Sequence, residues 1–233
     1  MSGEKASGGE AAGAPRRMLA QVLGHTLSVA LHFLFAPRAL WHGTAPMAEQ
    51  RVYFANHASN GDFAIVWAVL PHALRRRTRP VAAADYWRGL IRRFVARDVF
   101  NAVLIERRRE KRSEDPVEQM SVAIHRGATL LIFPEGGRSQ GGVLPFKTGL
   151  YHLARLHPAV PLVPVWIDNL NRVLPKGEIV PVPLLCTVTF GAPIHLGDGE
   201  AKDAFLTRAR DALLATRPTD EDGDGATEAE AAA

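Results

Sequence analysis

Short apolar runs alternate with helical patterns along most of this chain. Apolar runs bounded by turn residues predict buried strands at 52–55, 80–84, 102–106, 128–133, 161–167 and 184–190. Between them, apolar positions at helical spacing predict helices at 62–74, 86–97, 114–126, 149–156 and 203–215. The alternation predicts an α/β fold, with a mixed, mostly parallel sheet flanked by crossover helices. In such a sheet a ligand site lies at the carboxyl ends of the strands.

The segment from Met18 to Ala36 precedes this region and is mostly apolar. Its polar residues fall on one helical stripe: Gln21, His25, Ser28 and His32. Such a helix suits a membrane interface, and candidate headgroup anchors flank it: Arg16, Arg17, Arg38 and Trp41. A transmembrane span and a core helix also fit its length, whereas a cleaved signal peptide fits less well because no clear cleavage site follows. We expect residues 16–48 to form an amphipathic, membrane-associating helical segment.

Composition and charge indicate the partner and the ends of the chain. With 233 residues, 47% hydrophobic and 22% charged, the chain is typical of one folded domain with appendages. Composition predicts a disordered leader at 1–15 and a disordered acidic tail at 216–233. Without the six acids of 220–230, residues 1–219 carry a net charge of +10, 28 basic against 18 acidic residues. We therefore expect an anionic phospholipid surface as partner and no nucleic acid, because no nucleic-acid module signature is present.

A polar turn follows the first predicted strand, with the sequence Asn56-His57-Ala58-Ser59-Asn60-Gly61-Asp62. Turn and capping residues of this kind fit a strand-to-helix turn, with Asp62 at the head of the helix. His57 and Asp62 can then come within hydrogen-bond reach. The carboxylate would orient the imidazole while its other nitrogen takes a proton from a substrate. A helix cap beside a chance histidine has the same spacing.

A second polar turn follows the strand at 128–133, with the sequence Pro134-Glu135-Gly136-Gly137-Arg138-Ser139. Its glycines let the backbone approach a ligand, and its arginine offers donors suited to phosphate. Three further blocks accompany the two turns: Val103-Leu104-Ile105-Glu106-Arg107, Phe146-Lys147-Thr148-Gly149 and Val160-Pro161-Leu162-Val163-Pro164-Val165. In this order, over about residues 50–195, they resemble the glycerolipid acyltransferases of the lysophosphatidic acid type, with their patterns N-H-x-x-x-x-D and F-P-E-G-[ST]-R-S.

The resemblance implies an O-acyltransferase domain over residues 49–215. It would move a fatty acyl group from an acyl thioester, acyl-CoA or acyl carrier protein, to the hydroxyl of lysophosphatidic acid or a related lysophospholipid. His57 would be the general base and Asp62 would hold it, and the acceptor would be bound by Arg107, Glu135, Gly136, Arg138 and Lys147. No metal or cofactor is required. Such an enzyme is expected at the cytoplasmic face of the cell membrane, as a peripheral or monotopic protein.

Three departures from the family pattern leave the acceptor open. Gly137 stands where the family has Ser or Thr, and Asn101 where it usually has Gly. After the second strand, where many relatives carry a lysine, the chain reads Val81-Ala82-Ala83-Ala84-Asp85. Another lysophospholipid or lyso-lipid hydroxyl is therefore an open acceptor.

Two other functions fit parts of the sequence. Gly137-Arg138-Ser139-Gln140-Gly141 matches the G-x-S-x-G elbow of serine esterases, and Asp168 and His195 follow in the matching order. However, Pro134, Glu135 and Gly136 separate this motif from its strand. The other alternative is a non-enzymatic lipid-binding protein that kept the fold. The presence of His57, Asp62 and Glu135 argues against it.

Overall fold

The computed structural model describes residues 8–106, 115–139, 142–168 and 186–218. Within these residues the strands form a single sheet: β1 (Arg38–Trp41), β2 (Val52–Ala55), β3 (Thr78–Ala83), β4 (Val103–Ile105), β5 (Thr129–Ile132), β6 (Leu162–Asp168) and β7 (Thr187–Phe190). Their order is β1-β7-β6-β2-β5-β3-β4, and only the pair of β6 and β7 is antiparallel. The predicted α/β class with a mixed, mostly parallel sheet is confirmed.

The middle of the sheet is buried on both faces. β2 lies between β5 and β6, with Val52 in register with Leu130 and Leu162. Because side chains alternate along a strand, Val52 and Phe54 belong to one hydrophobic core and Tyr53 belongs to the other. Parallel strands covered on both faces read as continuous apolar runs, so these strands were predictable.

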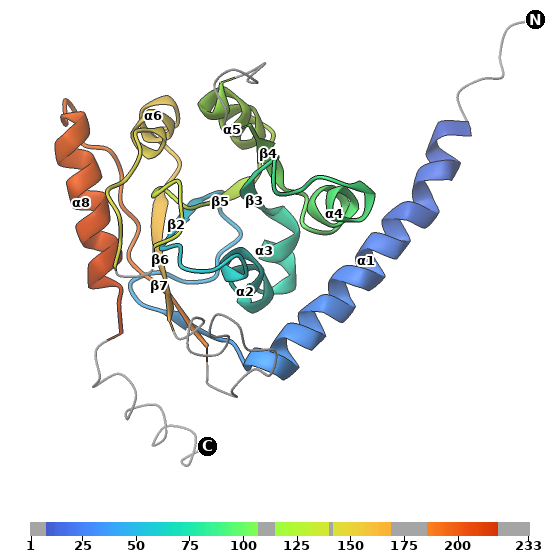
Figure 1. The fold of residues 1–233 in the computed structure, drawn as a ribbon. Coiled ribbons are helices and arrows are strands. Elements are labelled where there is room, and N and C mark those ends of the chain that lie inside the picture. Colours follow the sequence, from blue (N-terminus) through green and yellow to red (C-terminus); the bar gives the residue numbers. More distant parts are fainter. Residues whose placement is uncertain (1–7, 107–114, 140–141, 169–185, 219–233) are drawn as a thin grey trace, which may run out of the picture.

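Helices cover both faces of the sheet (Figure 1). The core around Val52 and Phe54 is completed by α5 (Pro116–His125), α6 (Gly149–Leu156) and α8 (Lys202–Ala215). The opposite core includes residues of α2 (Asp62–Val69), α3 (His72–Arg77) and the end of α1 (Gly8–Phe35). The short α4 (Leu90–Phe94) continues into the π-helix η1 (Val95–Val99), which packs against α1.

Two predicted helices differ from the structure. The helix expected at 62–74 is split into α2 and α3, because Pro71 favours an extended conformation for the preceding residue and Leu70 has ψ 137°. The helix expected at 86–97 begins only at Leu90, after Gly89 with φ +92°, and changes to π geometry at Val95. The expected strands shift by no more than a few residues.

β1 was not predicted, because it falls in the segment 16–48 that was expected to be helical. It pairs in parallel with β7 at the edge of the sheet. The ring of Trp41 stacks on Phe190, with ring centroids 4.0 Å apart and an interplanar angle of 9°. Trp41 therefore packs one ring face on the protein, and its expected role as a headgroup anchor stays a prediction.

α1 begins at Gly8, so residues 8–15 are helical rather than disordered as expected. The side facing the domain carries three small buried residues, Ala20, Gly24 and Ser28, followed by the larger Leu31 and Phe35 at its end. A Cβ at Gly24 would lie 3.5 Å from Val99 Cγ1 and 3.7 Å from the Trp67 ring, so the helix lies close to η1 and α2. Of the predicted polar stripe, only Ser28 is buried, and its hydroxyl accepts a 2.6 Å hydrogen bond from Arg75.

The outer side of α1 is apolar and exposed. Its large exposed residues are Met18, Leu19, Val22, Leu23, Val29, Phe33 and Leu34. By length and composition, Ala14–Phe35 is apolar enough to cross a membrane, and 22% of this candidate span is buried inside the structure. Core helices and signal sequences share this length and composition.

The chain ends differ in part from the predicted appendages. Thr216, at the start of the expected tail, is buried and donates a 2.8 Å hydrogen bond to the carbonyl of Ala212. Residues 1–7 and 219–233 lie outside the described residues.

Candidate active site

His57 lies in the turn between β2 and α2, facing the first residue of the helix. Its Nδ1 is 2.9 Å from Oδ2 of Asp62, which is 1% exposed. The same oxygen accepts hydrogen bonds from the backbone N–H groups of Ala58, at 2.7 Å, and Ser59, at 2.9 Å. The predicted pair therefore forms, and the carboxylate also folds the turn that carries the histidine.

The contacts of His57 determine which of its nitrogens is available. An ionised carboxylate only accepts hydrogen bonds, so the proton of a neutral imidazole belongs on Nδ1 and Nε2 is left as an acceptor. One ring face stacks on Phe133, with centroids 4.2 Å apart and an interplanar angle of 23°. The side chain is 16% exposed, which leaves one edge open to a substrate.

Glu135, in the polar turn after β5, supports the turn that carries His57. Its carboxyl group is buried and accepts two backbone hydrogen bonds, from His57 N at 2.9 Å and Leu144 N at 2.8 Å. The carbonyl of His57 accepts a further 2.8 Å bond from the backbone N–H of Ser139. Both carboxyl oxygens of Glu135 thus hold backbone N–H groups, a role that the sequence did not indicate, and its expected role as an acceptor ligand stays a prediction.

Asn56 is a site residue whose contact the sequence did not indicate. Its side-chain amide donates to the carbonyl of Ile167 at 3.0 Å and accepts from the N–H of the same residue at 2.8 Å. The His57 turn is therefore fixed to the end of β6, a strand more than a hundred residues later. The only sequence signal was an amide residue directly after the strand, which a turn residue also explains.

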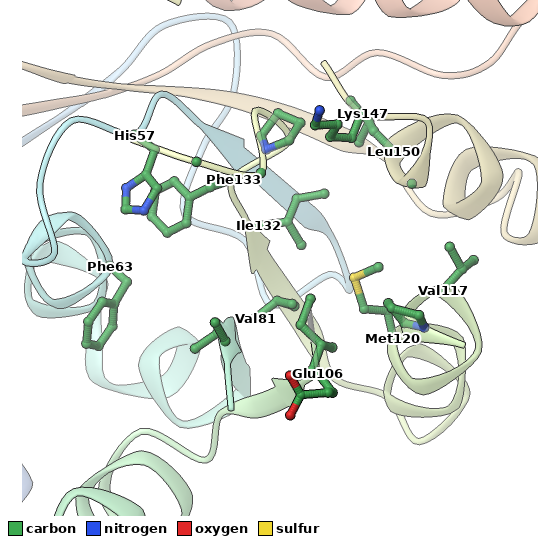
Figure 2. A pocket seen from close by; sticks show the side chains of 18 of the residues that line it. His57, Phe63, Val81, Glu106, Val117, Met120, Ile132, Phe133, Lys147 and Leu150 are labelled. Carbon is green, nitrogen blue, oxygen red and sulfur yellow. The ribbon is translucent and has the colours of Figure 1, made fainter. Parts of the chain in front are cut away.

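A cavity of about 1000 Å³ opens beside His57 (Figure 2). One part is polar and is lined by His57, Gly136, Gly137, Arg138, Lys147, Thr148 and His152. The other part is mainly apolar and is lined by Val81, Ala82, Ala83, Ile105, Val117, Met120, Ile132 and Leu150, with Glu106 on its border. The cavity thus offers an ionic end, which includes His57, and an apolar end.

The two glycines of the second motif differ in their surroundings. Gly136 has φ +69°, and a Cβ there would meet Lys147 Cγ at 3.1 Å. It therefore needs to be glycine both for its backbone and for the lysine stem that crosses it. Gly137 has open space within 4 Å, so the family's Ser or Thr fits there without change.

The other sequence departures also have a place in the structure. Asn101 has φ +50°, a left-handed conformation that glycine and asparagine adopt most readily, so its replacement of the family's glycine keeps the same backbone. Ala82 and Ala83, in the stretch where the resemblance leads one to expect a lysine, line the cavity. Arg107, the remaining predicted acceptor ligand, lies outside the described residues.

The residues of the esterase alternative are not brought together at this cavity. Ser139, Asp168 and His195 are absent from the described residues that line it. The chain after β5 forms a turn and then a loop, and the next described helix begins at Gly149, so the strand–Ser–helix elbow is not formed. His195 is exposed, and its carbonyl accepts a 2.7 Å hydrogen bond from Arg208.

Metal ligands do not gather in the part of the chain that the structure describes. It contains no group of three or more His, Cys, Asp or Glu side chains placed to hold a metal ion. The reaction class inferred from the sequence requires no metal, and that inference stays a prediction.

Comparison with known proteins places the chain beside enzymes of one kind. A family model described as Acyltransferase matches residues 40–168. A 1-acyl-sn-glycerol-3-phosphate acyltransferase from Cocos nucifera is 26% identical over 187 residues, 79% of this chain and 54% of the relative. The alpha form from Bos taurus is 29% identical over 189 residues, 77% of this chain and 62% of the relative. The chain thus spans 54% and 62% of the length of these two curated relatives.

A solved structure has the same fold. The 1-acyl-sn-glycerophosphate (LPA) acyltransferase PlsC from Thermotoga maritima aligns with a TM-score of 0.65 and 19% sequence identity. The alignment covers 86% of this chain and 79% of the other.

Proposed function

The chain belongs to the acyltransferase family, and from this premise we propose that it transfers a fatty acyl group from an acyl thioester to the hydroxyl of lysophosphatidic acid or a related lysophospholipid. The observation that carries the proposal is the hydrogen-bonded pair of His57 and Asp62 beside a cavity with an ionic and an apolar end. The names of the relatives support the same acceptor class.

The reaction needs a base at the acceptor hydroxyl. In our proposal Nε2 of His57 takes the hydroxyl proton as the oxygen attacks the thioester carbonyl carbon. The carbon–sulfur bond then breaks, an ester remains, and the leaving thiolate receives the proton from the imidazolium. Asp62 holds the ring and stabilises its cation, and general-base catalysis of this kind contributes roughly 10²–10⁴-fold in rate.

The ionic end of the cavity suits the phosphate of the acceptor. Arg138 and Lys147 are exposed cations on its wall, which they share with Gly136, Gly137 and His57. Arginine gives directional, charge-assisted hydrogen bonds to phosphate, and lysine adds a point charge. Arg107 is proposed as a further phosphate ligand on the family resemblance alone.

The apolar end of the cavity suits an acyl chain. Its wall is built by β3, β4, β5 and the first turns of α5, which together supply side chains such as Val81, Ile132 and Met120. Burying methylene groups against such a wall is favourable by about 0.8 kcal/mol each. The donor is proposed to be acyl-CoA or acyl carrier protein.

The proposed place of action is the surface of a phospholipid membrane. The exposed apolar side of α1 and the basic body of the chain support attachment at the interface. We propose peripheral or monotopic attachment at the cytoplasmic face of the cell membrane, where acyl thioesters are available.

The test is acyl transfer from labelled acyl-CoA to a panel of lysophospholipids, with wild type, His57→Ala and Ser139→Ala compared. We expect wild type to acylate lysophosphatidic acid or another member of the panel. His57→Ala should lose at least about 10²-fold in kcat, and Ser139→Ala should keep most of it.

The outcomes separate the alternatives. Transfer that survives in His57→Ala would remove the base role, and loss in Ser139→Ala with release of free fatty acid would indicate an esterase. Absence of transfer from both acyl-CoA and acyl carrier protein, with lipid still bound, would indicate a lipid-binding protein.

A further inference from the structure

We propose that the α4 tip, defined as residues 86–93, is a second bilayer-docking element that acts beside α1 and binds an anionic phospholipid surface. The proposal goes beyond the acyl-transfer function, because it concerns how the chain meets lipid and needs no chemistry at His57.

The α4 tip presents an unusually exposed apolar pair. Leu90 is 90% exposed and Ile91 is 81% exposed, on the first turn of a five-residue helix. Gly89, with φ +92°, turns the chain outward just before them. Single exposed apolar residues are common, but an adjacent pair with almost no protein contact is the kind of surface that marks an interaction site.

Positive charge surrounds this pair. Four exposed arginines lie on or next to the tip: Arg88, Arg92, Arg93 and Arg97. The guanidinium of Arg92 lies 5.4 Å from the centroid of the Tyr86 ring, and Asp85 is the neighbouring acid. Apolar side chains flanked by arginine and tyrosine match the composition of elements that rest in the headgroup region of an anionic membrane. This charge favours lipid over an uncharged protein partner.

The α4 tip is fixed to the other candidate lipid-facing element. α1 packs against η1, the direct continuation of α4 (Figure 1). Arg16 of α1 forms a 2.8 Å ion pair with Asp98 and lies 5.8 Å from the ring centroid of Phe94. The exposed apolar residues of this half of α1 are Met18, Leu19, Val22 and Leu23. The two elements are therefore held together, and each carries exposed apolar and basic residues.

The same stretch borders the cavity. Asp85, Tyr86 and Trp87 are among its lining residues, and Trp87 packs edge-on against Phe63, with ring centroids 5.8 Å apart. A bilayer that holds Leu90 and Ile91 would therefore lie next to an entrance of the cavity. A substrate dissolved in that bilayer could reach the cavity without crossing water.

The first test measures binding of the full chain to vesicles of phosphatidylcholine, with and without phosphatidylglycerol. The double variant Leu90→Asp/Ile91→Asp should reduce the partition coefficient at least about tenfold. The matched control, Val122→Asp/Leu156→Asp, changes side chains that are 43% and 53% exposed on α5 and α6, and should bind like wild type. Unchanged binding of the first variant, or absence of wild-type binding, would overturn the proposal.

The second test reports the position of the tip directly. The single cysteine of the chain, Cys186, is buried, and burial raises the pKa of its thiol to about 12, so an introduced surface thiol can be labelled selectively. An environment-sensitive fluorophore on Ile91→Cys should shift to the blue when anionic vesicles are added. The same label on Val122→Cys should stay in water.

Two results of the labelling would contradict docking. A probe at position 91 that stays in water while the protein sediments with vesicles would leave α1 as the sole anchor. A blue shift that depends on protein concentration without vesicles, with a matching rise in molecular mass, would assign the tip to contact with a second copy of the chain.

Discussion

At the scale of single residues, His57 is fixed through its backbone as well as its ring. Its N–H donates to Glu135 and its carbonyl accepts from Ser139, while Nδ1 faces Asp62. The second motif therefore orients the first. We expect Glu135→Gln, whose amide nitrogen cannot accept a backbone hydrogen bond, to lower kcat about tenfold or more with little change in the acceptor KM.

The comparison for Glu135 is Arg138→Ala, which removes an exposed cation from the cavity wall. This variant should raise the acceptor KM more than it lowers kcat, because it removes binding and leaves the base in place. If Glu135→Gln raises the acceptor KM as much as Arg138→Ala does, Glu135 binds the acceptor directly.

The adjacent glycines give a second prediction at this scale. Gly136→Ala places a Cβ on a residue with φ +69° and against the Lys147 stem, so it should lose about 1–2 kcal/mol of stability and weaken acceptor binding. Gly137→Ser has open space and should behave like wild type. Urea unfolding and acceptor KM measure both effects, and equal losses in the two variants would contradict this reading of the turn.

At the scale of elements, the features that the sequence predicted correctly are those with a local signal in the chain. The apolar runs of β2 and β5 and the pairing of His57 with Asp62 across one short turn are local, and both were predicted. β1 was missed because it exists through its pairing with β7, far away in the chain. The roles of Glu135 and Asn56 were also missed, because their partners Leu144 and Ile167 are backbone groups brought near by tertiary structure. Pro71 and Gly89 gave local signals that were overlooked.

α8 illustrates an element whose start depends on an ion pair. Glu200 accepts two bonds from Arg208, at 2.8 and 2.7 Å, and one from the N–H of Gly197 at 2.9 Å. The hydrogen bonds from Arg208 are the main cause that lowers the pKa of Glu200 from 4.5 to about 2. A lowered carboxyl pKa adds stability that is complete above pH 4.5 and is lost as the pH falls towards 2.

Because this pair is close to the surface, screening limits its contribution to about 0.5–1 kcal/mol. The free energy of unfolding should therefore decrease less between pH 4.5 and 2 in Glu200→Gln than in wild type. Urea denaturation across that range measures the slope. Asp203→Asn is the control, since that carboxylate is 91% exposed and 3.8 Å from its partner Lys202. An equally reduced slope in both variants would contradict a specific role for Glu200.

At the scale of the whole molecule, the sheet order creates the site. β2 and β5 are parallel neighbours, so the turns that follow them lie side by side at one edge of the sheet, above the cavity. β3 and β4 extend the same edge and supply the apolar wall. The fold thereby brings together the base and the ionic and apolar ends of the cavity, which come from separate parts of the chain.

This arrangement predicts that the acyl chain of the donor stabilises the whole protein. In a His57→Ala background, where turnover is suppressed, Tm should rise with the length of the acyl chain in a series of acyl-CoAs and exceed the rise with CoA alone. Each additional buried methylene adds about 0.8 kcal/mol to binding, and binding to the native state raises its stability. The rise should stop once the apolar end is filled. Ala82→Phe narrows that end, so the rise in Tm should stop at a shorter acyl chain in this variant. Tm shifts that do not depend on chain length, or the same limiting chain length with and without Ala82→Phe, would place the acyl chain outside this cavity.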